Sequence, residues 1–80
     1  MAKLRLNLFA SLKDYFEEDM ELNVSELTLN ELKNALVTQV PAVKELLSTC
    51  RFAVNDTFVN PNHVFSENDH VLILPPSSGG

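Results

Sequence analysis

The sequence predicts an α+β fold with a mixed sheet of about five strands and one main crossing helix. Three observations carry this prediction. Polar and apolar residues alternate over 3–8 and 20–24, which is the pattern of half-buried strands. A capping signal opens a helical apolar stripe over 28–40. Strand-like stretches separated by turn residues then return over 52–74.

The first strand is predicted in KLRLNLFA (3–10), where three alternating leucines point to one face. A short helix is expected next, in SLKDYFEED (11–19), with Ser11 as its N-cap. The apolar side chains of this helix should share one face: Leu12, Tyr15 and Phe16. The second strand, MELNV (20–24), alternates again, so a compact connection should join two neighbouring strands.

The main helix has the clearest start in the chain. Thr28 and Glu31 form a T-x-x-E capping box, and Leu27 and Leu32 are placed as a hydrophobic staple around it. The stripe facing the core consists of Leu29, Leu32, Leu36 and Val40. Pro41 should end the helix, and AVKELLS (42–48) predicts a further short helical segment.

The second half of the chain returns to strands. FAVN (52–55) and TFVN (57–60) flank Asp56 as a hairpin, and turns are expected at 60–62 and 66–69. HVLIL (70–74) is nearly continuously apolar, which predicts a central strand buried on both faces. Pro75 and Pro76 should stop this strand, because proline supplies no ladder donor.

This order of elements favours a β-grasp roll, in which the helix lies across one face of the sheet. Other α+β arrangements share the same order. We expect a single domain over 1–74 and an extended, flexible tail over 75–80.

Composition limits the classes of function. A net charge of −5 and a pI of about 4.7 argue against nucleic acid and suit a partner with a basic surface. The chain has neither an apolar run of about 20 residues nor the pattern of a signal peptide, so we expect a cytoplasmic protein that does not contact membranes. One cysteine excludes an internal disulfide, and two unpaired histidines make a metal site unexpected.

The side chains that could carry catalysis have simpler interpretations. Cys50 is expected to be a structural thiol, because no base lies near it in the sequence. His63 and His70 are expected to be solvated turn residues, and the acidic run over 17–26 a solvated surface. We therefore predict no catalytic apparatus within this chain.

The C-terminal sequence LPPSSGG (74–80) contains the only two glycines, Gly79 and Gly80. Residues without a Cβ can pass through a narrow channel, which favours a thin arm that carries its carboxylate into a partner's active site. The alternative is a frayed terminus. A carboxylate, with a pKa of about 3.3–3.7, is a poor electrophile until it is activated, for instance as a mixed anhydride with AMP. A sulfur donor would then produce a nucleophilic thiocarboxylate.

The chain resembles the small subunits of molybdopterin synthase, which are ubiquitin-like sulfur carriers with a β-grasp fold. The resemblance runs along nearly the whole chain. It rests on LFASLKD (8–14), LNELKNAL (29–36), AVND (53–56) and DHVLILPPSSGG (69–80). The last segment is the most specific, because it joins a strand, two prolines, a short polar pair and a terminal Gly-Gly.

The resemblance implies a cycle of sulfur transfer. An E1-like adenylyltransferase would consume ATP to activate Gly80, and a sulfurtransferase or other sulfur donor would convert it to the thiocarboxylate. The tail would then enter the molybdopterin synthase large subunit, where sulfur passes to the cyclic pyranopterin precursor of the molybdenum cofactor. The family assembles as a heterotetramer of two small and two large subunits. The resemblance implies no permanently bound cofactor.

The resemblance also assigns roles to residues. Gly80 would hold the activated carboxyl group. The residues implied in binding are Gly79, Ser78, Ser77, Pro76, Pro75, Leu74, Phe9 and Lys13. Two departures are visible: Lys13-Asp14 replaces a frequent Arg-Glu, which removes the planar guanidinium fork, and Glu67-Asn68-Asp69 replaces the usual Asp-Gly-Asp turn. Asparagine is the next-best residue after glycine for a left-handed turn position.

Three alternatives remain at this stage. A sulfur carrier of the thiamine pathway shares the fold and the Gly-Gly end, but such carriers tend to be shorter and to lack the Pro-Pro. A ubiquitin-like protein modifier would be joined through Gly80 to lysines of target proteins. A plain β-grasp interaction domain would keep its function without Gly79 and Gly80.

Overall fold

The computed structural model describes residues 2–76. Five strands, one α-helix of three turns and three shorter helical segments follow one another along this part of the chain. Their order is β1 (Ala2–Leu8), the 3₁₀ helix η1 (Ala10–Asp14), β2 (Asp19–Val24), α1 (Leu29–Gln39), the 3₁₀ helix η2 (Pro41–Val43), α2 (Lys44–Ser48), β3 (Arg51–Val54), β4 (Thr57–Phe58) and β5 (His70–Leu74).

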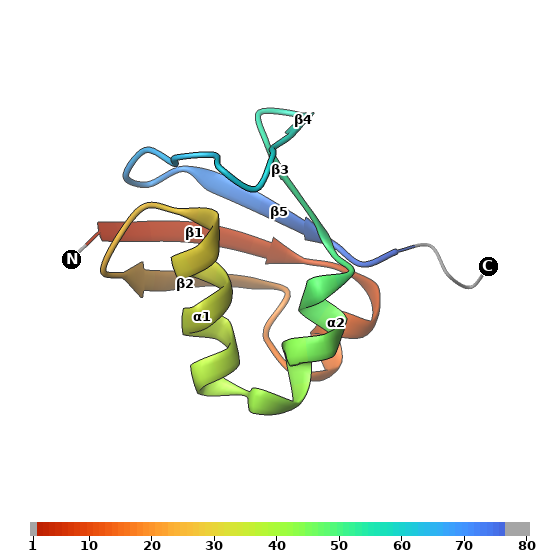
Figure 1. Ribbon diagram of the computed structural model, residues 1–80. Coiled ribbons are helices and arrows are strands. Elements are labelled where there is room, and N and C mark those ends of the chain that lie inside the picture. Colours follow the sequence, from red (N-terminus) through yellow and green to blue (C-terminus); the bar gives the residue numbers. More distant parts are fainter. Residues whose placement is uncertain (1, 77–80) are drawn as a thin grey trace.

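The five strands form one mixed sheet in the order β2-β1-β5-β3-β4. β1 and β5 are parallel, with Leu6 opposite Val71, and the other neighbouring strands are antiparallel. The predicted mixed five-stranded sheet is therefore confirmed, and so is the central position of β5. Both α1 and α2 lie on the same side of this sheet (Figure 1).

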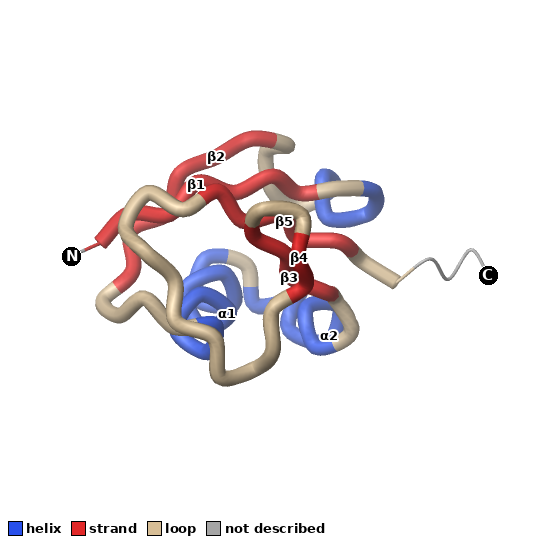
Figure 2. Tube along the Cα trace, turned by 90° about the horizontal axis from the view of Figure 1, so that it is seen from above, coloured by secondary structure: helices blue, strands red, loops and turns tan. Residues whose placement is uncertain are grey.

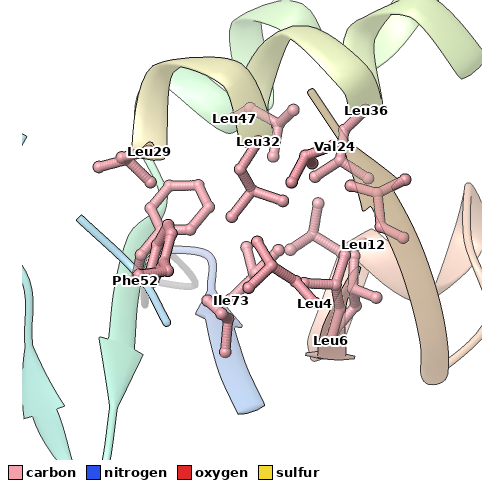
Figure 3. Close-up of a cluster of buried hydrophobic side chains, with 14 of the residues drawn as sticks. Leu4, Leu6, Leu12, Val24, Leu29, Leu32, Leu36, Leu47, Phe52 and Ile73 are labelled. Atoms are coloured by element: carbon pink, nitrogen blue, oxygen red, sulfur yellow. The ribbon is translucent and has the colours of Figure 1, made fainter. Parts of the chain in front are cut away.

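The core fills the space between the helices and the sheet, as Figure 3 shows. Side chains that alternate along β1 and β5 meet the apolar stripe of α1 there. Those with no exposed surface include Leu4, Leu6, Leu8, Leu12, Leu32, Leu36, Val43, Val71 and Ile73. Each fully buried aliphatic side chain contributes about 1.5–3 kcal/mol relative to an exposed one. Within residues 2–76, no polar or charged residue is classed as buried.

The start of α1 follows its sequence signal closely. The backbone N–H of Glu31 donates to the Thr28 Oγ1 at 3.2 Å, which satisfies one of the free donors of the first turn. The Glu31 carboxylate accepts a hydrogen bond from the Ser25 hydroxyl at 2.8 Å, so the serine takes the place of the reciprocal capping-box contact. The helix ends at Gln39, two residues before Pro41, as predicted.

The short helix after β1 differs from its prediction. It is a 3₁₀ helix, and its N-cap is Phe9 rather than Ser11, with no side-chain capping bond. Ala10 takes a left-handed backbone (φ 54°) that turns the chain sharply out of β1, so the helix begins before the serine. Leu12 alone enters the core fully, while Phe16 is half-buried and Tyr15 is exposed.

The prediction that β5 is buried on both faces was wrong. Val71 and Ile73 point into the core, but Leu72 and Leu74 remain half-buried on the opposite face. The physical reason is that both helices pack on one side of the sheet, so centrality in the sheet does not cover its outer face (Figure 1).

Asparagine and aspartate supply the left-handed turn positions, as expected of a chain with so few glycines. Asn55 (φ 54°) and Asp56 (φ 65°) form the two-residue turn between β3 and β4. Asn68 (φ 69°) takes a left-handed backbone in the turn before β5, so asparagine fills the position at which the resemblance places a glycine. The long connection from β4 to β5 crosses in front of α1 (Figure 2) and is anchored by the Phe65 N–H, which donates to the Leu27 carbonyl at 2.8 Å.

Candidate functional site

The candidate site lies at the edge of the sheet where β1 and β5 both end. Because these two strands are parallel, their carboxyl ends meet at one edge, with Leu8 opposite Ile73. β1 continues into η1, and β5 continues into Pro75 and Pro76, so both connections leave from the same place (Figure 1). The resemblance had assigned roles to residues on both of these segments, and the fold brings the two segments together.

Phe9 and Leu74 are each one residue beyond the paired Leu8 and Ile73. Phe9 keeps an extended backbone (φ −118°, ψ 159°), so its side chain points away from the buried Leu8 and toward the outer face that Leu74 also occupies. Both side chains are half-buried. Such a pair is anchored in the protein yet leaves apolar surface for a partner to cover.

The two prolines come directly after this pair. Strand β5 ends at Leu74, and the chain continues through a half-buried Pro75 and an exposed Pro76. The expected end of the strand is confirmed. The roles predicted for Ser77, Ser78, Gly79 and Gly80 concern residues outside the described part of the chain.

Lys13 lies on η1 at the same end of the sheet, with an exposed side chain. Its Nζ is 3.8 Å from the Glu18 Oε1, and both side chains are about half exposed or more. An exposed pair at this separation contributes little to stability, so an acidic group on a partner can compete for this lysine.

Four residues that sequence reasoning did not single out extend the site across the outer face of the sheet. Ala53 lies opposite Leu72 of β5 and opposite Phe58 of β4, which makes an apolar row across three strands. Ala53 itself is buried, so the accessible apolar surface of this row belongs to Leu72 and Phe58. Phe58 is 55% exposed, and the Arg51 guanidinium carbon lies 5.2 Å from the centre of its ring. The alternation in RFAV (51–54) would have indicated the outward position of Arg51, but its partner on β5 follows only from the pairing of strands.

Cys50 lies next to this edge, between α2 and β3. Its Sγ donates to the Leu46 carbonyl oxygen at 3.2 Å, and the side chain is half-buried. Burial raises the pKa of the Cys50 thiol, and the charge of Lys33 offsets this rise only in part. A protonated thiol is a weak nucleophile, which agrees with the expected structural role.

The histidines do not form a catalytic or metal-binding group. His63 packs edge-to-face on Phe65 with 4.9 Å between ring centres, and His70 contacts the Asn7 side chain on the outer face. In the part of the chain that the structure describes, no three His, Cys, Asp or Glu side chains are placed to hold a metal ion. Over the same residues, the helices are too short and too polar to cross a membrane.

Comparisons with known proteins agree with this geometry. The sequence model of the ThiS family matches residues 6–80. A molybdopterin synthase sulfur carrier subunit from Chlamydomonas reinhardtii is 33% identical over 66 residues, which cover 80% of this chain and 78% of that protein.

Solved structures give the same picture of the fold. Subunit 1 or 2 in the complex of molybdopterin-converting factor subunits from Helicobacter pylori matches with a TM-score of 0.67 and 29% identity, covering 98% of this chain and 99% of that one. SAMP1 from Haloferax volcanii matches with a TM-score of 0.80 and 20% identity over 98% and 99% of the two chains, a likeness of fold. The ubiquitin-like β-grasp prediction is thereby confirmed, and the chain belongs to the ThiS family of small sulfur-carrier-like proteins.

Proposed function

We propose that this chain is the sulfur-carrying small subunit of a molybdopterin synthase. One observation supports the proposal above the others. The strand that leads to the Gly-Gly terminus is the central strand β5, and its last residue, the half-buried Leu74, lies at the same edge of the sheet as the half-buried Phe9. A rigid sheet thus delivers the tail from a fixed point, next to apolar surface that a partner can cover. The match to a sulfur carrier subunit at 33% identity adds independent support.

In the proposed cycle the reactive group is the carboxylate of Gly80. One of its oxygens attacks the α-phosphorus of ATP on an E1-like adenylyltransferase, and pyrophosphate leaves. A persulfide of the sulfurtransferase then attacks the acyl carbon, and AMP leaves; a second thiol of the donor cleaves the resulting acyl disulfide, which releases the thiocarboxylate and leaves a disulfide on the donor. The thiocarboxylate sulfur forms a bond to a carbon of the cyclic pyranopterin precursor and displaces an oxygen substituent there; water then cleaves the bond between the acyl carbon and sulfur, which restores the Gly80 carboxylate and leaves the thiol on the precursor. ATP is consumed by the activating partner, so this chain needs no bound cofactor of its own.

The proposed docking surface for the large subunit combines the edge of the sheet with its outer face. Leu74 and Phe9 lie at the base of the tail, and the half-buried Leu72 continues the apolar surface along the outer face of β5. The Helicobacter pylori structure is a complex of two subunits of a molybdopterin-converting factor, which supports a large-subunit partner for this chain as well. The catalytic groups for sulfur transfer would belong to that partner, and the cycle would run in the cytoplasm.

The test is the intact mass of the chain after incubation with ATP, the adenylyltransferase and a sulfur donor. We expect a mass gain equal to the replacement of one oxygen by sulfur, located at Gly80 by fragmentation. The control is the same chain with one alanine added after Gly80, which should unfold at the same temperature and remain unloaded. Loading of the extended chain, or no loading of the native chain under conditions that load a known carrier, would contradict the proposal.

A second step separates the proposed pathway from its alternatives. The loaded chain is mixed with a molybdopterin synthase large subunit and the pyranopterin precursor, and formation of the dithiolene product is measured. Loading without dithiolene formation would favour the thiamine-pathway carrier. Recovery of Gly80 in isopeptide linkage to lysines of other proteins would favour a protein modifier, a role named for the small archaeal modifier protein 1 of Haloferax volcanii.

A further inference from the structure

Two hollows share Lys33 in their walls and follow one another along the edge of the molecule formed by α1, α2 and β3. The first, of about 240 Å³, lies between the start of α1, strand β3 and the chain after β4, with Arg51, Phe58, Val59 and Pro61 around it. The second, of about 300 Å³, lies between α1 and α2, with Lys44 and the two amide side chains of Asn30 and Asn34. We call the surface formed by Lys33, Lys44 and Arg51 with these two hollows the basic surface.

The basic surface departs from the charge of the rest of the chain. The sequence has 11 acidic and only 6 basic side chains, yet three of those six basic side chains line the two hollows and none of the acidic ones does. Lys3 and Lys13 pair with Glu21 and Glu18. Among residues 2–76, no ion pair joins any of the three cations of the basic surface, so their charge is available to a ligand.

Two of these cations are held in place by aromatic rings. The Lys33 Nζ lies 5.4 Å from the centre of the Phe52 ring, and the Arg51 guanidinium lies above Phe58. Phe52 is buried beside Leu29 at the end of the core (Figure 3), so its ring is a fixed support for the lysine. A cation held in this way loses less side-chain freedom when it meets an anion.

The first hollow combines apolar side chains with the charged side chains of Lys33 and Arg51. Phe58 is 55% exposed, and Val59 and Pro61 follow it along the wall. Each hollow is at or below the lower end of the range of about 300–1,000 Å³ that is typical of small-molecule sites. Because the two hollows are adjacent and share Lys33, they suit an extended chain better than a compact ligand.

We propose that the basic surface binds an acidic segment of a partner protein, in which carboxylates alternate with apolar side chains. One apolar side chain would cover Phe58 and Val59, and carboxylates on either side would meet Arg51, Lys33 and Lys44. Arg51 lies opposite Leu74 in the sheet, so this surface is continuous with the base of the tail. The proposal does not depend on the sulfur chemistry, because it rests only on charge, shape and the support of the two cations.

The test is a titration of the isotopically labelled chain with a synthetic peptide of alternating glutamate and leucine, followed by amide chemical shifts. The expected result is saturable shifts at Lys33, Lys44, Arg51 and Val59, and no saturable response to the matched peptide with glutamine for glutamate. The affinity should fall about threefold for each of Lys33→Gln and Arg51→Gln, and it should fall further when salt is raised, because exposed charge pairs of this kind are weak and screened.

The matched control is Lys3→Gln, which removes an exposed lysine that pairs with Glu21 outside the basic surface and should leave the affinity unchanged. Three outcomes would overturn the proposal. The first is equal binding of the glutamine peptide or no response at millimolar peptide. The second is saturation of the same amides by inorganic phosphate or ATP alone, which would indicate a small-anion site. The third is sedimentation of the free chain as a dimer that Glu17→Gln or Glu18→Gln abolishes, which would indicate a second copy as the occupant.

Discussion

Arg51 of β3 lies directly opposite Leu74 of β5, the last strand residue before the two prolines. This pairing places a cation and a half-buried leucine together at the base of the tail. It also makes this edge of the sheet common to two surfaces, the apolar surface around Leu74 and the basic surface that extends from Arg51 to α1 and α2. The tail therefore begins where a partner can contact the folded domain on both sides.

Leu74→Gln should weaken binding to the large subunit by about tenfold, because a central apolar contact in an interface typically contributes more than 1 kcal/mol. Isothermal titration calorimetry with the large subunit measures the change. Val64→Gln is the matched control, because Val64 is 68% exposed on the connection between β4 and β5. A loss of affinity in both variants, or in neither, would contradict the assignment of the docking surface.

Local sequence signals predicted the elements whose structure depends on local physics. The alternating leucines of β1, the cap at Thr28 and the turn at Asn68 all follow from patterns within a few residues. The position of Arg51 opposite Leu74 depends on the pairing of β3 with β5. The two residues are 23 positions apart in the sequence, so no local pattern reports their contact. The exposure of Leu72 likewise depends on which face the helices cover.

Ala10 illustrates a feature that sequence patterns cannot report, because alanine has no preference for a left-handed backbone. At φ 54° it bears a cost of about 1–2 kcal/mol, which glycine does not have. Ala10→Gly should therefore raise the free energy of unfolding by about 0.5–1 kcal/mol, after the extra chain entropy of glycine is subtracted. Urea denaturation measures it.

The matched control for Ala10→Gly is Ala42→Gly. Ala42 is also exposed, but it lies within η2 and is absent from the described residues with positive φ. Glycine should destabilise the protein there by about 0.5–1 kcal/mol. A loss of stability at both positions would mean that the left-handed turn at Ala10 does not strain the alanine.

Thr28→Ala should lower the free energy of unfolding by about 1 kcal/mol, because the Glu31 N–H loses the acceptor that it has in the Thr28 Oγ1. Thr38→Ala is the control within the same helix. Thr38 is exposed, and its hydroxyl donates to the Asn34 carbonyl. That carbonyl also accepts a backbone hydrogen bond within the helix, so it keeps a donor when the hydroxyl is removed. Alanine has the higher helix propensity, so this change should be neutral or stabilising by up to about 0.5 kcal/mol. Equal losses in thermal denaturation would show that the cap has no special role.

Cys50 should react slowly with iodoacetamide at neutral pH, because the thiolate is the reactive form and burial raises the pKa of this thiol. The rate, followed by intact mass, should rise only at a pH clearly above the value of about 8.5 at which a free cysteine titrates. Lys33→Gln should shift the profile to still higher pH, since it removes the charge that favours the thiolate. Lys44→Gln is the control, as Lys44 is not a source of the shift.

The same shift has a consequence for stability, with a sign that follows from linkage. The pKa of Cys50 is higher in the folded chain than in the unfolded one, so its contribution to stability is fully present below the unfolded pKa. That contribution is lost as the pH rises through the folded pKa, because the unfolded chain then releases its proton first. Cys50→Ser should therefore reduce the loss of stability that urea denaturation records as the pH rises above about 8.5, where a free cysteine titrates. An unchanged pH dependence in this variant would contradict the assignment of the shift to Cys50.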